Sequence, residues 1–181
     1  MQPNKNKYFI LFLVSALIVG LDQITKYFIC KLVPLYSQIE VIDGFFNIVH
    51  IRNSGVAFGL FKRFGSEYRL ISMLVVSLIA VFLIFFLVSQ LKRGCKLQAF
   101  SLSLILGGAI GNLIDRMFIG EVVDFIDVHW AEVYHWPAFN VADSAITVGI
   151  IFIIFDELFL SRKREKETPP EQRKIFTAVD D

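Results

Sequence analysis

Long apolar runs alternate along the chain with shorter segments that carry most of its polar residues. The four apolar runs lie at about 8–29, 70–91, 97–119 and 144–161. A helix needs roughly 20 consecutive, mostly apolar residues to cross the hydrocarbon core of a bilayer. The pattern therefore predicts four transmembrane helices, with two long connecting segments at 30–69 and 120–143.

The two connecting segments have the pattern of short strands. The stretch "SQIEVIDGFFNIVHIRNSGVAFGLF" is rich in β-branched and aromatic residues, and turn signals interrupt it at Asp43-Gly44 and Asn53-Ser54-Gly55. The stretch "VVDFIDVHW" indicates one more strand in the second segment. We therefore expect an all-α membrane protein whose four transmembrane helices carry a small extracytoplasmic β-cradle.

The composition supports a membrane protein. Apolar residues make up 55% of the 181 residues and charged residues 19%, whereas about a quarter of a soluble domain is charged. The net charge of +1 gives no indication of nucleic-acid binding. We expect one monomeric membrane domain over 1–161, followed by a charged, proline-containing tail at 162–181 that is disordered and cytoplasmic.

Basic residues set the expected orientation, because short cytoplasmic loops are enriched in Lys and Arg. They cluster before the first predicted helix, between the second and third, and after the fourth, at Lys5, Lys7, Lys92, Arg93, Lys96, Arg162, Lys163, Arg164 and Lys166. Both termini are therefore expected in the cytoplasm. Cys30 and Cys95 then lie on opposite sides of the membrane, so no disulfide is expected. The first run is interpreted as a retained helix, because no small-residue cleavage site follows it.

Polar residues within the predicted helices are costly in lipid and therefore informative. Asp22 and Lys26 lie four positions apart near the outer end of the first helix, with the acid first, which is the favourable order for a helical ion pair. They form either a structural pair or part of a site that handles substrate.

The third apolar run contains "LGGAIGNLIDR". Its three glycines, Gly108 among them, allow a neighbouring helix to approach closely. Asn112, Asp115 and Arg116 follow at positions i, i+3 and i+4, so they are expected to share one face near the outer end. They form a polar clasp between helices, a support for a site, or both.

Two aspartates lie close to the fourth apolar run. Asp143 is placed where the N-cap of the fourth helix is expected, and a carboxylate there accepts backbone N–H bonds. Asp124 stands between apolar residues in a predicted strand, where an acid has no evident structural role. With Asn53 and Asn140, these groups all gather near the outer ends of the helices, which predicts a site there.

Two carboxylates in a partly dry site are typical of an aspartic dyad, in which the pair shares one proton. The ionised member takes a proton from water, while the protonated member hydrogen-bonds the scissile carbonyl. A serine–lysine pair of Ser144 and Lys26 is a conceivable alternative. His50, His129 and His135 lack HExxH or another zinc-binding spacing, so we expect neither a metal nor a cofactor.

Five motifs in order, on a chain with four predicted spans, resemble those of one family. They are "DQITK" at 22–26, "NSGVAF" at 53–58, "GGAIGNLIDR" at 107–116, "VVDFI" at 122–126 and "FNVADS" at 139–144. The sequence resembles signal peptidase II, a family of bacterial aspartic endopeptidases of the inner membrane. Val56 departs from the alanine more often found in the family, at a position interpreted as packing.

The resemblance implies a dyad of Asp124 and Asp143 near the outer face of the membrane. It implies that the substrate is a prolipoprotein, cleaved just before a cysteine that carries diacylglycerol, and that membrane lipid is the other partner. Supporting roles are implied for five residues, Asp22, Asn53, Asn112, Arg116 and Asn140. The same motifs contain four further candidate support residues, Lys26, Gly55, Gly108 and Asp115.

Two other classes of membrane protein also place acids in their helices. A proton-coupled transporter uses intramembrane carboxylates as a proton relay, but its acids would line a path across the membrane rather than gather at one face. A non-catalytic membrane scaffold would use the same polar residues only to hold helices together.

Overall fold

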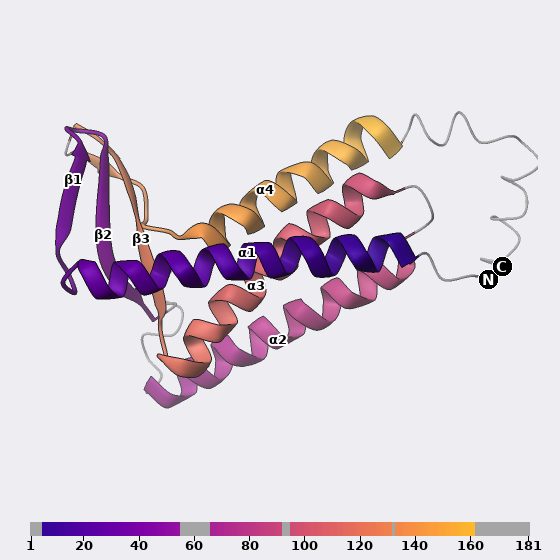
Figure 1. Ribbon diagram of the computed structural model, residues 1–181, viewed down its shortest axis with the longest axis horizontal. Coiled ribbons are helices and arrows are strands. Elements are labelled where there is room, and N and C mark those ends of the chain that lie inside the picture. Colours follow the sequence, from indigo (N-terminus) through magenta and orange to yellow (C-terminus); the bar gives the residue numbers. More distant parts are fainter. Residues whose placement is uncertain (1–4, 55–65, 92–94, 132, 162–181) are drawn as a thin grey trace, which may run out of the picture.

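The computed structural model describes residues 5–54, 66–91, 95–131 and 133–161. Figure 1 shows a bundle of long helices with a small sheet standing across one end. The elements in chain order are α1 (Lys5–Leu32), β1 (Gln38–Ile42), β2 (Phe46–Asn53), α2 (Ser66–Gln90), α3 (Lys96–Phe118), β3 (Val122–Trp130), β4 (Tyr134–His135) and α4 (Val141–Phe155), followed by a π-helical segment at Asp156–Ser161. The "NSGVAF" motif from Gly55 onward and the tail at 162–181 lie outside the described residues.

Three of the helices are long and apolar enough to cross a membrane. They cover Lys7–Leu32, Leu70–Gln90 and Lys96–Phe118, in agreement with the first three predicted spans. The helix α4 is shorter, at 15 residues, and continues into 6 residues of π-helix. It begins at Val141 rather than at the predicted residue 144, so the fourth crossing of the membrane stays a prediction.

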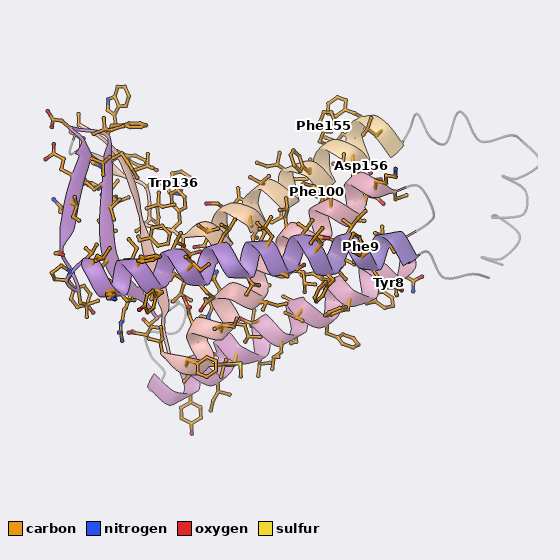
Figure 2. All side chains as sticks on the ribbon, in the orientation of Figure 1. Tyr8, Phe9, Phe100, Trp136, Phe155 and Asp156 are labelled. Carbon is orange, nitrogen blue, oxygen red and sulfur yellow. The ribbon has the colours of Figure 1, made fainter. Side chains whose placement is uncertain are left out.

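The helix α3 lies at the centre of the bundle and packs against α1, α2 and α4. Buried apolar residues from three helices form the core, namely Leu11, Ile84, Val88, Leu102 and Leu106. Large apolar side chains such as Phe9, on α1, point outward from the bundle instead (Figure 2). An apolar outer surface suits a bundle whose surroundings are lipid.

Glycines in α3 let the neighbouring helices approach, as the sequence predicted. A Cβ atom added at Gly108 would collide with the carbonyl oxygen of Ala142 in α4. A Cβ atom added at Gly111 would lie 2.6 Å from the Oδ2 atom of Asp22 in α1. Small residues therefore bring three helices together at the depth where the polar residues gather.

The sheet is antiparallel, with strand order β1-β2-β3-β4. This agrees with the predicted strands and adds β4, a two-residue strand paired with the end of β3. The register of β2 with β3 places Asn53 opposite Val122 and Ile51 opposite Asp124. Because β3 is the next element after α3, the start of this strand lies at the end of the helix bundle (Figure 1).

Candidate active site

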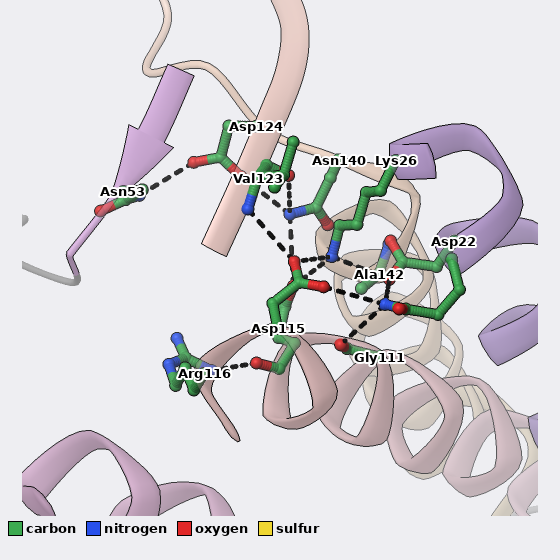
Figure 3. A network of polar contacts seen from close by, with 12 residues as sticks. Asp22, Lys26, Asn53, Gly111, Asp115, Arg116, Val123, Asp124, Asn140 and Ala142 are labelled. Carbon is green, nitrogen blue, oxygen red and sulfur yellow. Dashed lines mark hydrogen bonds and ion pairs between the residues drawn. The ribbon is translucent and has the colours of Figure 1, made fainter. Parts of the chain in front are cut away.

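Asp124 is held on β3 with both carboxylate oxygens hydrogen-bonded. The residue is 2% exposed, so its charge is largely removed from water. Its Oδ2 accepts a hydrogen bond from Asn53 Nδ2 at 2.9 Å, and its Oδ1 accepts one from Asn140 Nδ2 at 2.8 Å. Figure 3 shows Asn53 reaching it from β2 on one side, with Asn140 on the other.

Asp143 lies in the first turn of α4, but the predicted N-cap role is wrong for it. The N-cap is Asn140, whose extended backbone (φ −133°, ψ −174°) precedes the first helical turn. Asp143 occupies the third helical position, and the two side chains form a reciprocal capping box. This arrangement leaves the Oδ1 atom of Asp143 to accept a hydrogen bond from Asn112 Nδ2 at 2.8 Å.

Asn140 connects the two acids. Its Nδ2 donates to Asp124, and its Oδ1 accepts a hydrogen bond from the backbone N–H of Asp143 at 2.9 Å. The residue is fully buried, at 0% exposure. One rigid side chain therefore fixes the strand acid relative to the helix acid.

A buried ion cluster lies behind the two acids. Lys26 Nζ is 2.8 Å from Asp22 Oδ2, 2.8 Å from Asp115 Oδ2 and 3.0 Å from Asn112 Oδ1. Both of its carboxylate partners also accept backbone N–H groups, Asp22 from Ala142 at 3.0 Å and Asp115 from Val123 at 3.1 Å. The cluster is thus a structural clasp that also holds the backbone next to Asp124 and at the start of α4 (Figure 3).

The three polar residues predicted to share a face of α3 have different partners in the structure. Asn112 and Asp115 enter the network, whereas the guanidinium of Arg116 donates to Ser77 Oγ on α2 and to the carbonyl of Asn112, both at 3.3 Å. A residue missed from the sequence, Gln23, donates through Nε2 to Asp115 Oδ1 at 3.0 Å. Gln23 lies between Asp22 and Lys26 in "LDQITK", and this position could have indicated that it belongs to the same polar network.

The serine–lysine arrangement does not fit the geometry. The hydroxyl of Ser144 donates to the backbone carbonyl of Asn140 at 2.9 Å. The ammonium of Lys26 is instead held between two carboxylates, each at 2.8 Å. A lysine base has to be neutral and in reach of the serine hydroxyl, so this pair is not arranged for nucleophilic catalysis.

Burial raises the pKa of Asp124 to about 6, from the usual value of 3.8. Desolvation of the carboxylate is the largest cause, and the negative charge of Asp143 raises the pKa further. The hydrogen bonds from Asn53 and Asn140 act in the opposite direction, because they stabilise the charged form. The charge of Asp143 is therefore close enough to affect the protonation of Asp124.

Asp124 also borders an open pocket of about 240 Å³. Its other lining residues come from the end of β2 and from the segment before α4, namely Ile51, Arg52, Asn53, Ser54, Pro137 and Ala138. The buried carboxylate of Asp124 therefore forms part of the wall of a pocket that opens outside the bundle. A concave site lined by an acid with a raised pKa is a common location of catalysis.

The fold is a helix bundle with an apolar outer surface, and it holds two hydrogen-bonded carboxylates beside an open pocket. These features are those of a membrane protein with a site built on a pair of acids. Residues 14–159 match the family model of signal peptidase (SPase) II. The chain is 47% identical over 141 residues to the lipoprotein signal peptidase of Syntrophotalea carbinolica, covering 78% of this chain and 86% of that protein. It is 42% identical over 167 residues to that of Geobacter metallireducens, covering 92% and 99%.

Two solved structures, each described as a bacterial membrane enzyme, share the fold. One has a TM-score of 0.73 at 34% identity and covers 82% of this chain and 92% of its own. The other has a TM-score of 0.74 at 33% identity and covers 88% and 93%. The chain therefore belongs to the signal peptidase II family and is a bacterial membrane peptidase.

Proposed function

We propose that this protein is an aspartic endopeptidase that removes signal peptides from prolipoproteins, cleaving just before the cysteine that carries diacylglycerol. The observation that carries the proposal is the pair of acids, Asp124 and Asp143, held by the same asparagine. The names of the relatives, lipoprotein signal peptidase, supply the substrate class.

In this proposal Asp143 is the ionised member of the dyad and Asp124 the protonated one. Burial raises the pKa of Asp124 to about 6, which favours its protonated form. Asp143 lies in the first turn of α4, where the helix dipole stabilises a negative charge. Its carboxylate also accepts hydrogen bonds from Asn112 Nδ2 and from the backbone N–H of Asn140.

The chemistry then proceeds in two steps. Asp143 takes a proton from water, the water oxygen bonds to the scissile carbonyl carbon, and Asp124 gives its proton to the carbonyl oxygen. The resulting diol collapses as the C–N bond breaks. The leaving nitrogen takes the proton from Asp143, and the proton on the former carbonyl oxygen returns to Asp124.

The remaining residues of the network are proposed to hold this geometry. Asn53 and Asn140 orient Asp124, and Asn112 orients Asp143. The pair of Asp22 and Asp115 on Lys26 fixes the backbone behind them. Gly108 allows α4 to approach α3, and Arg116 and Gly55 remain candidates for substrate contact.

We further propose that α4 crosses the inner membrane as a fourth span, with both termini cytoplasmic and the acid pair near the outer face. Four acids, Asp22, Asp115, Asp124 and Asp143, belong to one network of polar contacts near the start of β3 and the start of α4, which favours a peptidase over a proton relay. The peptidase is proposed to act as a monomer, with the signal helix of its substrate and the diacylglyceryl chains approaching from the lipid.

The test is a cleavage assay with a purified, diacylglyceryl-modified precursor in detergent or lipid vesicles. Asp124→Asn and Asp143→Asn should each lower kcat at least about 10⁴-fold, the upper end of the loss of general acid–base catalysis. The exposed Asp43, in the β1–β2 turn, provides the matched control, and Asp43→Asn should cleave at the normal rate. The unmodified precursor should resist cleavage by the unaltered enzyme.

Normal turnover by Asp143→Asn would show that this acid only caps α4 and would overturn the dyad. Normal turnover by Asp124→Asn would also overturn the dyad. Equal cleavage of precursors with and without the diacylglyceryl group would contradict the proposed lipid requirement. It would not contradict the proposed dyad.

A further inference from the structure

A second cluster of ionisable side chains, distinct from the pair of Asp124 and Asp143, lies where β3 pairs with β4. Asp127 and His129 lie on β3, and His135 lies on β4, where it pairs directly with His129. The ligand atoms of these three residues all lie within 4.8 Å of one another. The histidines lack a helical zinc spacing in the sequence, and it is the antiparallel pairing of β3 with β4 that brings them together.

The distances within the cluster match those of a metal-binding site. His135 Nδ1 is 3.2 Å from Asp127 Oδ1, and His129 Nδ1 is 3.6 Å from Asp127 Oδ2. Two ligands that each lie 2.0–2.1 Å from a tetrahedral zinc ion are separated by roughly 3.3–3.4 Å. We propose that Asp127, His129 and His135 form a binding site for a divalent transition-metal ion, with Zn²⁺ as the best match to two imidazoles and one carboxylate.

A buried asparagine beside the cluster supports this assignment. Asn47 lies opposite Asp127 in the pairing of β2 with β3 and is 3% exposed. Its Nδ2 donates to Asp127 Oδ2 at 3.3 Å, but its Oδ1 has no hydrogen-bond partner among the described residues. A buried amide oxygen without a partner is costly, and a bound cation or a metal-bound water would satisfy it.

The two histidines differ in how freely they can adjust to an ion. Their rings are stacked, with centroids 4.8 Å apart and planes inclined by 15°. His129 is buried, whereas the His135 side chain is 46% exposed on a two-residue edge strand. His135 therefore has room to tilt so that both Nδ1 atoms point at one ion.

The proposed site lies on the opposite face of β3 from the catalytic acid. Successive side chains of a strand point to alternate faces, so Asp127 and His129 share a face from which Asp124 points away. The ion would join β3 to β4 and so hold in place Trp130 at the end of β3, Tyr134 in β4 and Trp136 directly after β4. We assign it a structural role in the sheet, separate from the chemistry of the dyad.

The position of the tryptophans gives a direct test. The chain has two tryptophans, and each is adjacent in sequence to one of the histidine ligands, Trp130 to His129 and Trp136 to His135. ZnCl₂ is titrated into the untagged full-length protein in detergent, with Cys30→Ser and Cys95→Ser in the background to remove thiol binding. We expect a saturable change in tryptophan emission at one ion per chain.

Variants decide whether the response comes from the proposed site. His135→Ala and Asp127→Asn should each weaken Zn²⁺ binding at least about 10-fold, because altering even the surroundings of a metal site costs 10- to 100-fold. The third histidine of the chain, His50, contacts the carbonyl of Val33, the residue directly after α1, and provides the matched control. His50→Ala should bind Zn²⁺ as the background protein does.

A second measurement guards against misfolding of a variant. Zn²⁺ should raise the Tm of the background protein and of His50→Ala, but not that of His135→Ala, whose exposed position makes it tolerant of replacement. The proposal is overturned if the background protein shows no saturable response, if His135→Ala and Asp127→Asn bind as tightly as the background, or if His50→Ala loses binding to the same extent.

Discussion

Asn140 and Asp143 cap each other's backbone at the start of α4. Asn140 Oδ1 accepts the Asp143 N–H at 2.9 Å, and Asp143 Oδ2 accepts the Asn140 N–H at 3.3 Å. The same asparagine donates its amide to Asp124 at 2.8 Å. A capping motif that usually only stabilises a helix end here also positions both acids of the proposed dyad.

Two substitutions of Asn140 should separate its capping role from its positioning role. Asn140→Ser keeps a good N-cap but removes the amide that donates to Asp124. We expect a fall in kcat of roughly 10- to 100-fold, because a buried Asp124 oxygen that has lost its donor costs about 1–3 kcal/mol. Asn140→Ala should show the same fall in kcat and also lose about 1 kcal/mol of stability with the cap. A fully active Asn140→Ser protein would show that the hydrogen bond to Asp124 is dispensable.

The raised pKa of Asp124 predicts a specific dependence of stability on pH. The folded-state pKa of about 6 exceeds the usual value of 3.8, so protonated Asp124 is favoured by folding. Its contribution to the free energy of unfolding is full below pH 3.8 and is lost as pH rises through about 6. The total is on the order of 3 kcal/mol, at 1.36 kcal/mol for each pKa unit.

The measurement compares Tm of the unaltered protein with that of Asp124→Asn between pH 4 and 7. Because the amide does not titrate, the unaltered protein should lose Tm relative to the variant as pH rises. Asp124→Asn should thus be the relatively more stable protein at neutral pH. A Tm difference that does not change with pH would contradict the raised pKa.

Replacing Gly111 by alanine should disturb the network through sterics alone. The added Cβ would lie 2.6 Å from Asp22 Oδ2, so the carboxylate must move away from Lys26 and from the backbone N–H of Ala142. We expect Gly111→Ala to lower the free energy of unfolding by about 1–3 kcal/mol, typical of overpacking, and to lower cleavage as well.

Gly20 in α1 provides the matched control, because a Cβ there meets nothing within 4 Å. Gly20→Ala should be neutral or slightly stabilising, since alanine favours the helix over glycine by roughly 0.5–1 kcal/mol. Equal stability of the two variants would show that the contact between α1 and α3 at this depth is loose.

The proposed orientation predicts different accessibility for the two cysteines. Cys30 lies near the sheet-bearing end of α1, and Cys95 directly precedes α3 at the other end of the bundle. In intact cells, a membrane-impermeant thiol reagent should label a variant that keeps only Cys30 and spare one that keeps only Cys95. Permeabilised cells provide the control, because Cys95 should then react. Labelling of Cys95 from outside would reverse the proposed topology.

The helices and most of the strands could be predicted from the sequence, because both follow from local patterns of apolar and polar residues. Three long apolar runs are helices of membrane-spanning length, and the β-branched stretches around Phe46 and Val123 form the antiparallel sheet. The glycines before Asn112 also predicted a close approach of helices, because a missing side chain has a direct steric consequence.

Tertiary structure alone decided which polar groups meet. The sequence placed Asp143 at the N-cap, whereas Asn140 takes that role, since the helix start depends on backbone geometry before α4. Arg116 turns toward Ser77 on α2, a helix far away in the sequence. His135 joins Asp127 and His129 only through the pairing of β3 with β4. Periodicity predicts which face of an element a residue occupies, but the partners across that face depend on how the elements pack.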